Sequence, residues 1–349
     1  MNISQLLIPF FAAVLVSLSL TPLVRKLALI WGAIAKPGGR HIHVRTTPKL
    51  GGLAIIGSFF TVVVYILITN PSQLHFVDMA ILGLDANLFG VLAGALILVA
   101  LGVVDDKYDL PPRVKLLFQM IATLTVVLFG VKIWWVSHPF GGPDILLGNW
   151  TYLIVPLWLL AMINVMNWFD GLDGLTSGLS IIASLAIAFL ALEPFVDQPA
   201  TALLAIILAG ATLGFLPFNW NPASIFLGDT GSMFLGYMVG IFAIISGAKL
   251  ATAALVLGIP IFDAVWVVLR RLLTGQPLMQ GDRKHLHHRF LDAGFHPRTA
   301  TLMLYSIAAL FGLIALNTGT EGKVVALGWL VAGLVILGML LVIKAKQNH

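Results

Sequence analysis

Long apolar runs separated by short polar stretches dominate the chain. Eleven runs are long enough for a bilayer-crossing helix of about 20 residues, and they begin roughly at residues 4, 51, 87, 115, 150, 175, 200, 232, 251, 299 and 324. The polar stretches between them leave no room for a soluble domain. The pattern predicts an all-α polytopic membrane protein, with residues 1–349 forming one transmembrane domain of about eleven helices.

The composition supports this interpretation. Hydrophobic residues make up 59% and charged residues 10% of the 349 residues, which is more apolar surface than a soluble globule of this size can bury. The absence of cysteine excludes disulfides, thiolate metal sites and a cysteine nucleophile. No long basic stretch is interleaved with aromatic residues, so we expect no nucleic-acid partner.

Basic residues mark the cytoplasmic side of a membrane protein. With eleven spans, seventeen of the 20 Lys and Arg residues fall on one side, and Lys132, Lys249 and Lys323 fall on the other. Met1–Gln5 has no basic residue and Arg25 follows the first apolar run, which is typical of an uncleaved anchor. We therefore expect an N-terminus outside the cell, a cytoplasmic C-terminus and a location in the plasma (inner) membrane.

Polar clusters at the cytoplasmic ends of the apolar runs suggest a metal ion and an anionic substrate. Carboxylates at a membrane edge are costly and mark function by default, and these acids lie beside most of the basic residues. We expect an active site that faces the cytoplasm. Its catalytic loops lie near residues 25–50, 105–115, 164–174, 217–232 and 270–298.

The first cluster contains Asp105, Asp106 and Asp109. Adjacent carboxylates repel one another unless a cation or a proton lies between them, and Mg²⁺ prefers carboxylate and phosphate oxygens. The cluster is therefore a candidate Mg²⁺-phosphate site. A solvated loop at a helix end is the alternative.

Polar residues recur at every third position of the second cluster, from Asn164 through Asn167 and Asp170 to Asp173. On a helix this spacing places two carboxamides and two carboxylates along one strip, and Gly171 allows the close approach of a ligand. We interpret the strip as functional. Asparagine caps and a simple aspartate turn are the alternative.

The third cluster places Asp229 between Gly228 and Gly231, directly before an apolar run, with Asn219 upstream. Small residues at a helix N-terminus leave backbone amides open to a phosphate or a metal-bound phosphate. The motif by itself also fits Asp229 as a simple N-cap.

The fourth cluster lies in the largest cytoplasmic loop, where six of the eight residues from Asp282 to Arg289 are basic or histidine. Such a strip suits a pyrophosphate, and the alternatives are a zinc site and a basic patch at the lipid surface. Two further features stay open. The basic, glycine-rich stretch Lys36–Gly52 fits a phosphate or lipid headgroups, and Asp263, after Pro260, fits a helix contact or a ligand contact.

In this order the clusters resemble the polyprenyl-phosphate N-acetylhexosamine-1-phosphate transferases, a family of the glycosyltransferase 4 type. The resemblance covers most of the chain and implies about ten or eleven helices with Mg²⁺ or Mn²⁺ as cofactor. The implied reaction transfers a sugar-1-phosphate from a UDP-N-acetylhexosamine to polyprenyl phosphate, a membrane lipid, and releases UMP. The motifs that carry the resemblance are Thr47-Pro-Lys-Leu-Gly-Gly, Asp105-Asp106, Asn167-x-x-Asp170-Gly-x-Asp173-Gly, Asn219-x-x-Pro-Ala, Gly228-Asp-x-Gly-Ser and His285-x-His-His.

The histidine motif separates two branches of this family. His285-Leu-His287-His288-Arg289 is similar to the branch that uses UDP-GlcNAc and undecaprenyl phosphate to begin cell-surface polysaccharides. The peptidoglycan branch, which uses UDP-MurNAc-pentapeptide, typically has three consecutive histidines here and remains the alternative. The lipid length and the oligomeric state, a homodimer included, stay open.

The resemblance also implies roles for individual residues. Asp229 holds the cation, with Asn167 or Asp106 as a further ligand, and Asp105 and Asp106 lie near the lipid phosphate. The sequence does not decide whether that phosphate attacks directly or an aspartate acts first as a nucleophile. The other catalytic candidates are Asp170, Asp173, His287 and His288, and the substrate-binding candidates are Lys49, Lys115, Asn167, Asn219, Arg283 and His285.

Two other functions compete with this interpretation. The spacing of Asp105 and Asp109 also occurs in membrane prenyltransferases, although those proteins have a second, symmetric aspartate-rich motif. An ion-coupled transporter would place ionisable residues near the middle of the bilayer, often on repeated broken helices. The clustering at one membrane edge and the lack of a visible repeat favour the transferase.

Overall fold

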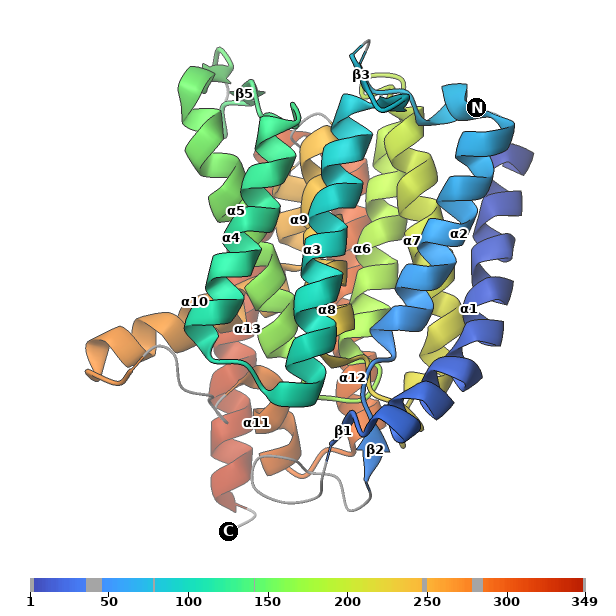
Figure 1. The fold of residues 1–349 in the computed structure, drawn as a ribbon. Coiled ribbons are helices and arrows are strands. Elements are labelled where there is room, and N and C mark those ends of the chain that lie inside the picture. The colour runs from blue at the N-terminus through green and yellow to red at the C-terminus, as the bar shows by residue number, and fades with distance from the viewer. Residues whose placement is uncertain are drawn as a thin grey trace.

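The computed structural model describes residues 3–35, 46–77, 79–140, 142–246, 250–277 and 285–347. Most of these residues are helical, as the apolar pattern predicts, and the helices form one bundle (Figure 1). The helices in chain order are α1 (Ile3–Trp31), α2 (Gly52–Thr69), α3 (Ala86–Tyr108), α4 (Pro112–Leu128), α5 (Thr151–Phe169), α6 (Leu175–Leu192), α7 (Pro199–Asn219), α8 (Gly228–Ile245), α9 (Leu250–Val256), α10 (Gly258–Leu273), α11 (Leu286–Asp292), α12 (Pro297–Asn317) and α13 (Thr320–Gln347), with 3₁₀ turns η1 (Pro71–Leu74) and η2 (Gly148–Trp150).

Nine helices of the described ranges are long and apolar enough to cross a membrane, namely α1, α2, α3, α5, α6, α7, α8, α12 and α13. The pair α9 and α10, bent by 82°, is a tenth candidate. The remaining run predicted from the sequence is α4, whose 17 residues are one fewer than the 18 residues of α2, α6 and α8, the shortest of the nine. The all-α class and the multi-pass character are confirmed, whereas the count of eleven stays a prediction.

A proline explains the bend between α9 and α10. The ring of Pro260 has no amide hydrogen and collides with the carbonyl group four residues earlier, at Val256, which is the last residue of α9. Helix α10 therefore leaves the bundle and projects sideways (Figure 1). Because it exposes Val265, Trp266 and Leu269, it forms an apolar arm.

Three short antiparallel hairpins, which the apolar pattern does not predict, occur in the described loops. In Figure 1, β1, β2, α11 and the C-terminus lie at the lower end of the bundle, whereas β3, β5 and the N-terminus lie at the upper end. We call the lower end the site end. The hairpins pair β1 (Ile34–Ala35) with β2 (Thr47–Pro48), β3 (Ala80–Ile81) with β4 (Leu84–Asp85), and β5 (Trp135–Val136) with β6 (Ile145–Leu146).

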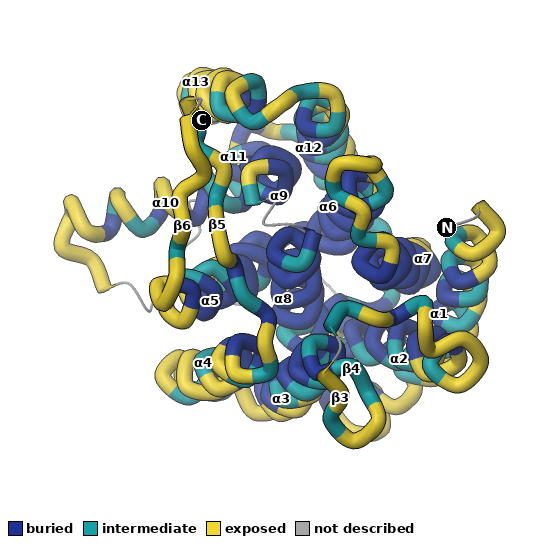
Figure 2. The backbone as a smooth tube through the Cα atoms, turned by 90° about the horizontal axis from the view of Figure 1, so that it is seen from above, coloured by how far each residue is buried: buried dark blue, intermediate teal, exposed yellow. Residues whose placement is uncertain are grey.

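Helix α8 lies at the centre of the bundle (Figure 2). The fifteen consecutive residues from Thr230 to Ile244 are all buried, and α8 packs against α2, α3, α5 and α6. Apart from Asp229 in its first turn the helix carries no charge, so its burial leaves no unpaired ion inside the protein. The first turn of α8 therefore lies at the centre of the helix packing.

Glycines allow α2 and α3 to approach this first turn. A Cβ atom on Gly52 would lie 2.2 Å from Gly231 Cα, and a Cβ atom on Gly102 would lie 2.4 Å from Thr230 Cα. Both distances are far below van der Waals contact, so only glycine permits this packing. Asp106 lies one turn after Gly102 on the same face of α3, and the close approach therefore brings it to the start of α8.

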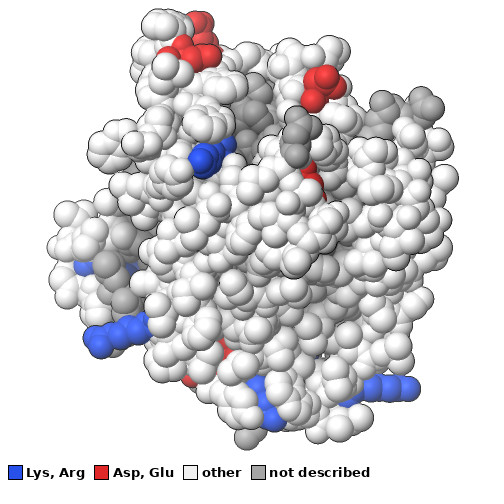
Figure 3. Space-filling model, turned by 45° about the horizontal axis from the view of Figure 1, so that its top comes forward, with Lys and Arg blue, Asp and Glu red and all other residues white. Residues whose placement is uncertain are grey.

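Charged side chains separate toward the two ends of the bundle. On the face shown in Figure 3, most of the visible acidic side chains lie toward the upper end and most of the basic ones toward the lower end. A broad, mostly uncharged band lies between them, with one basic patch at its left edge. Such a band is expected of a surface in contact with lipid, where an exposed charge is costly.

The close packing of α3 on α8 predicts the effect of a single methyl group. Gly102→Ala is expected to destabilise the protein by about 1–3 kcal/mol, because the added Cβ atom forces the two backbones apart. Gly328→Ala in α13 is the matched control, since a Cβ atom there meets no other atom within 4 Å. The measurement is the melting temperature in detergent, and equal values for both variants would show that the contact does not constrain the fold.

Candidate active site

An aspartate from another helix caps the start of α8. Asp106, near the end of α3, accepts hydrogen bonds from the backbone amides of Asp229 (2.9 Å) and Thr230 (3.0 Å) and from Thr230 Oγ1 (2.6 Å). Leu227, which precedes α8, offers no side-chain cap. Gly228 has a φ of +77°, and a Cβ atom there would lie 2.5 Å from Asp106 Oδ2, so both the backbone and the contact require glycine. The carboxylate also complements the positive end of the helix dipole.

Lys115, near the start of α4, links two carboxylates. Its Nζ atom donates to Asp229 Oδ2 at 2.7 Å and forms an ion pair with Asp105. Asp105 is 1% exposed, and its other oxygen accepts a hydrogen bond from the backbone amide of Leu110 at 2.8 Å. A buried carboxylate needs such partners. The ammonium group therefore holds Asp105 beside the first turn of α8.

The polar strip predicted from Asn164 to Asp173 is helical only as far as the end of α5. Asn167 Nδ2 donates to Asp229 Oδ1 at 2.9 Å, and Asn164 Nδ2 donates to a glutamine of α4 at 2.8 Å. Both asparagines therefore face neighbouring helices at the site. Beyond the helix the chain turns, so Asp170 and Asp173 take separate positions.

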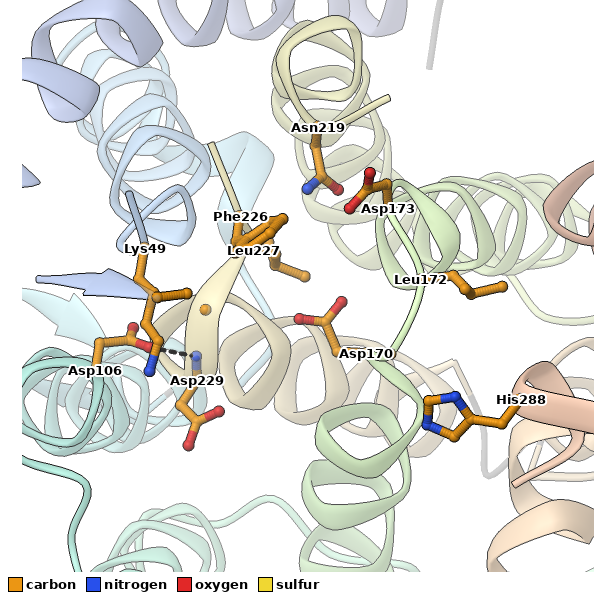
Figure 4. Close-up of a pocket in the computed structure, with 13 residues that line it drawn as sticks. Lys49, Asp106, Asp170, Leu172, Asp173, Asn219, Phe226, Leu227, Asp229 and His288 are labelled. Carbon is orange, nitrogen blue, oxygen red and sulfur yellow. Dashed lines mark hydrogen bonds between the residues drawn. The ribbon is translucent and has the colours of Figure 1, made fainter. Parts of the chain in front are cut away.

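Asp170 points toward the start of α8 (Figure 4). Burial raises the pKa of its carboxyl group to about 8; a hydrogen bond with Thr176 opposes the rise, and the carboxylates of Asp229 and Asp106 add to it. The main cause is therefore burial, and the negative charge of the neighbouring carboxylates comes second. A positive ion between these carboxylates would offset that negative charge.

Asp173 and Asn219 fasten the loop between α7 and α8. Asp173 Oδ2 accepts hydrogen bonds from Asn221 Nδ2 at 2.8 Å and from a backbone amide of the same loop at 3.0 Å. Asn219 Oδ1 accepts from Ser177 Oγ at 2.9 Å, and its Nδ2 donates to Ile225 O at 3.2 Å. Both side chains therefore shape the wall of the site in addition to lining it.

His287, at the start of α11, is buried, and neither ring nitrogen has a hydrogen-bond partner among the described residues. Its ring meets Phe169 edge-on, with centroids 5.2 Å apart, and lies parallel to His285 at 5.6 Å. A Cβ atom on Gly171 would lie 2.1 Å from His287 Nε2, so the glycine makes room for the ring. Burial, with a contribution from His288 and His285, lowers the pKa of His287 well below its usual range. Near pH 7 the imidazole is neutral and offers one donor and one acceptor.

These side chains border a polar cavity of about 270 Å³ at the site end (Figure 4). Lys49 and Asp106 lie on one side of it and His288 on the other. Asp109 does not join the cluster: its side chain is 90% exposed, and an oxygen of its carboxylate lies 3.6 Å from Lys49 Nζ. The reason is that α3 ends at Tyr108, before Asp109 can share a helix face with Asp106.

A larger cavity of about 600 Å³, which we call the apolar cavity, adjoins the first one and lies between α4, α5 and α10. Most of its lining is apolar, and Lys115 and Asn167 stand at its polar end. Gly171 and His288 line both cavities. Asp229, which lines the polar cavity and bonds both Lys115 and Asn167, therefore marks the boundary between a polar and an apolar space.

The carboxylate and amide oxygens at the site suit a hard divalent cation. Oxygens of a phosphate would supply the remaining ligands of that cation. Within the described ranges, no three His, Asp or Glu side chains lie close enough together to bind a metal ion by themselves. Mg²⁺ sites commonly combine one or two carboxylates with phosphate oxygens, and the carboxylate of Asp229 and the negative charge around Asp170 meet that requirement. Asp106 is less available, because three donors of α8 already engage it. Asp229, Asp106 and Asn167 stay the predicted ligands.

The structure brings together most residues that the sequence singles out, although their roles stay predictions. Arg283 lies outside the described residues. The sequence analysis misses Arg271, which is buried on α10, lines the apolar cavity and donates to Pro277 O at 2.8 Å. The only signal for it is a pair of arginines at the end of an apolar run. The predicted residues that line one or both cavities are Lys49, Asp106, Lys115, Asn167, Asp170, Asp173, Asn219, Asp229, His285, His287 and His288, with Asp105 held behind Lys115.

The chain is similar to several known proteins along most of its length. The family model described as glycosyl transferase family 4 matches residues 88–247. A Bacillus subtilis protein named probable undecaprenyl-phosphate N-acetylglucosaminyl 1-phosphate transferase is 34% identical, over 89% of this chain and 84% of that protein. The decaprenyl-phosphate N-acetylglucosaminephosphotransferase of Mycolicibacterium smegmatis is 33% identical, over 88% and 80% of the two chains.

A third relative, the undecaprenyl-phosphate alpha-N-acetylglucosaminyl 1-phosphate transferase of Escherichia coli K12, is 29% identical over 83% of this chain and 77% of its own. The matched regions thus extend over most of the chain rather than over one motif. Identity at this level over such a length shows that the protein belongs to glycosyl transferase family 4, among its polyprenyl-phosphate N-acetylhexosamine-1-phosphate transferases.

Proposed function

We propose that the protein transfers N-acetylglucosamine-1-phosphate from UDP-GlcNAc to undecaprenyl phosphate or a similar polyprenyl phosphate and releases UMP. The observation that carries the proposal is the junction of a polar and an apolar cavity at Asp229. A sugar nucleotide and a lipid phosphate need such a pair of neighbouring spaces. The printed names of the three relatives support the sugar and the class of lipid.

The polar cavity suits the donor. Lys49 and His288 lie on opposite sides of it, where each can bind a phosphate oxygen. Asp170 and Asp173 offer carboxylates to the hydroxyl groups of a ribose or a hexosamine. A cation that arrives with the donor phosphates would supply positive charge near Asp170.

The apolar cavity suits the acceptor. Its lining between α5 and α10 is mostly apolar, as a prenyl chain requires, and α10 also exposes the apolar side chains of Val265, Trp266 and Leu269. Lys115 stands at its polar end, where it can bind the lipid phosphate. An acceptor in this position presents its phosphate next to Asp229.

We further propose Mg²⁺, or Mn²⁺ in its place, as the cofactor, held by Asp229 with Asn167 or Asp106. Bound there, such an ion supplies positive charge to the pyrophosphate oxygens of the donor. The carboxylates of Asp229 and Asp106 near Asp170 support a cation at this point, because their negative charge adds to the rise that burial produces in the pKa of Asp170.

Transfer in one step agrees best with the contacts of the two adjacent aspartates. Asp106 has both oxygens engaged by α8, and Asp105 is buried and paired with Lys115, so neither carboxylate is poised as a nucleophile. We infer that an oxygen of the lipid phosphate attacks the β-phosphorus in line, while the bond from that phosphorus to the bridging oxygen breaks and UMP leaves. The lipid phosphate is mostly deprotonated near pH 7 and needs no base. Lys115 and His287 stabilise the phosphate charges during the step.

The site end is proposed to face the cytoplasm from the plasma (inner) membrane, with α4 as the eleventh span. The distribution of Lys and Arg supports this orientation, and the N- and C-terminal ends of Figure 1 lie at opposite ends of the bundle, as an odd number of spans requires. The carboxylates that line the polar cavity gather at the site end rather than at mid-bundle, which argues against an ion-coupled transporter. A homodimer stays a prediction.

The reaction is tested with purified protein, undecaprenyl phosphate, Mg²⁺ and a panel of labelled UDP-sugars. UDP-GlcNAc is expected to yield lipid-linked sugar and UMP in equal amounts. Product from UDP-MurNAc-pentapeptide alone would move the chain to the peptidoglycan reaction, and a prenyl diphosphate as the only effective donor would make it a prenyltransferase.

Asp229→Asn is expected to lower kcat by about 10²–10³-fold, in the range seen when one charge-stabilising group is removed. The amide still accepts from Lys115 through one oxygen but loses the charge that holds a cation, so the Mg²⁺ concentration for half-maximal rate should rise. Asp109→Asn is the matched control, because that carboxylate is exposed and lies outside the cavity. An Asp229→Asn enzyme with unchanged rate and unchanged Mg²⁺ dependence would refute the assignment.

Gly171→Ala is expected to lower kcat by roughly tenfold to a hundredfold, because its Cβ atom would displace the His287 ring that lies 2.1 Å away. Gly333→Ala in α13, where a Cβ atom meets nothing within 4 Å, should retain full activity. Steady-state kinetics of single and double variants provide the check. If Gly171→Ala acts through His287, adding it to His287→Ala should cause little further loss, whereas independent losses would contradict the steric explanation.

A further inference from the structure

Asp263 of α10 makes two contacts with the histidine segment, which we define as His285–His288. Its Oδ2 atom accepts a hydrogen bond from His285 Nδ1 at 2.6 Å, and its Oδ1 atom accepts one from the backbone amide of Leu286 at 2.7 Å. The carboxylate is 4% exposed. His285 stands at the N-terminus of α11 and makes no side-chain cap of its own, so Asp263 supplies that cap from another helix.

The first contact fixes the ring of His285. A carboxylate only accepts hydrogen bonds, so Nδ1 of the imidazole carries the proton, and the tautomer and plane of the ring are set together. His285 lies parallel to His287, with an interplanar angle of 5°, and the centroids of His287 and His288 are 4.3 Å apart. The orientation of the His285 ring therefore restricts the rings of His287 and His288, and all three rings line the apolar cavity.

The second contact ties the same segment to the wall of that cavity. Val267 lies one turn after Asp263 on α10, and Val267 and Arg271 both line the apolar cavity. α11 otherwise packs against α12 and α13. The Asp263 carboxylate is thus a direct link between the helix proposed to hold the acceptor lipid and the imidazoles proposed to face its phosphate.

We propose that Asp263 is a positioning residue for the transfer reaction. Its two hydrogen bonds attach the histidine segment to α10. Through His285 it also holds His287 and His288 at a constant distance from the acceptor. This inference rests on the proposed function for its kinetic consequences and on the two hydrogen bonds for its structural ones. A purely structural role would involve only the cap on Leu286.

Asp263→Asn separates these two roles. The amide oxygen can still accept from Leu286 N, so α11 keeps its cap, whereas the amide nitrogen now faces His285 Nδ1 and requires the opposite tautomer. We expect kcat to fall by about 10- to 100-fold, the range found when carboxylates that orient a histidine are replaced in metal sites, with KM for both substrates and the melting temperature unchanged. Asp292→Asn, at the exposed end of α11, is the matched control and should retain full activity. Full kcat in Asp263→Asn would overturn the proposal.

A double-mutant cycle with His285→Asn tests whether Asp263 acts through His285. The double variant should be no slower than the slower single variant, because both remove the same link. Losses that multiply would overturn the proposal. His285→Asn leaves the bond between Asp263 and Leu286 intact, so it also serves if Asp263→Asn does not fold.

Amide hydrogen exchange over Leu286–Asp292 gives a readout that needs no turnover. Exchange is expected to be faster in Asp263→Ala than in the unmodified protein or in Asp292→Asn, because α11 loses its cap and its link to α10. If the protein transfers no sugar phosphate but shows this difference, the proposed function fails and the positioning contact stands. Identical exchange in all three proteins would overturn the contact, whatever the reaction.

Discussion

The carboxylate of Asp106 joins the end of α3 to the start of α8, and the rest of the site is arranged around that junction. Hydrogen bonds to a charged group contribute about 1.5–3 kcal/mol each, and the helix dipole adds to them. The junction forms only because Gly102 and Gly228 leave space for the neighbouring backbone and for the carboxylate. It places Asp229 in the first turn of the most deeply buried helix, where its backbone cannot move freely.

A rigid start of α8 matters because several charged side chains lie close to it with little contact with solvent. Lys115 bonds two carboxylates and Asn167 holds the second oxygen of Asp229, so that residue keeps one orientation. Such preorganised groups stabilise developing charge without first having to rearrange. Burial is the main cause of the raised pKa of Asp170, and the nearby carboxylates of Asp229 and Asp106 add to it.

The bend at Pro260 accounts for the second, apolar cavity of the bundle. Because α10 turns away from α9 by 82°, an apolar cavity opens beside a polar one at the same end of the protein. A membrane-bound acceptor and a water-soluble donor have opposite solvation preferences, and their reacting phosphates can meet only where such spaces share a wall. Gly171 and His288 form part of that wall, and Asp263 holds the histidine segment beside it.

The sequence by itself determined the all-α class, most of the span positions, the family and most of the polar residues that line the two cavities. It could do so because apolar runs report bilayer crossing locally, and because costly polar residues at their ends stand out against an uncharged background. Only the tertiary structure decided that Asp106 caps α8, that Lys115 pairs with Asp105 and Asp229, that Arg271 lines the apolar cavity and that Asp263 bonds His285. It also decided that the polar strip after Asn167 leaves the helix, and that Asp109 turns outward. These features depend on distances between helices that are far apart in the chain, and no spacing along one helix specifies them.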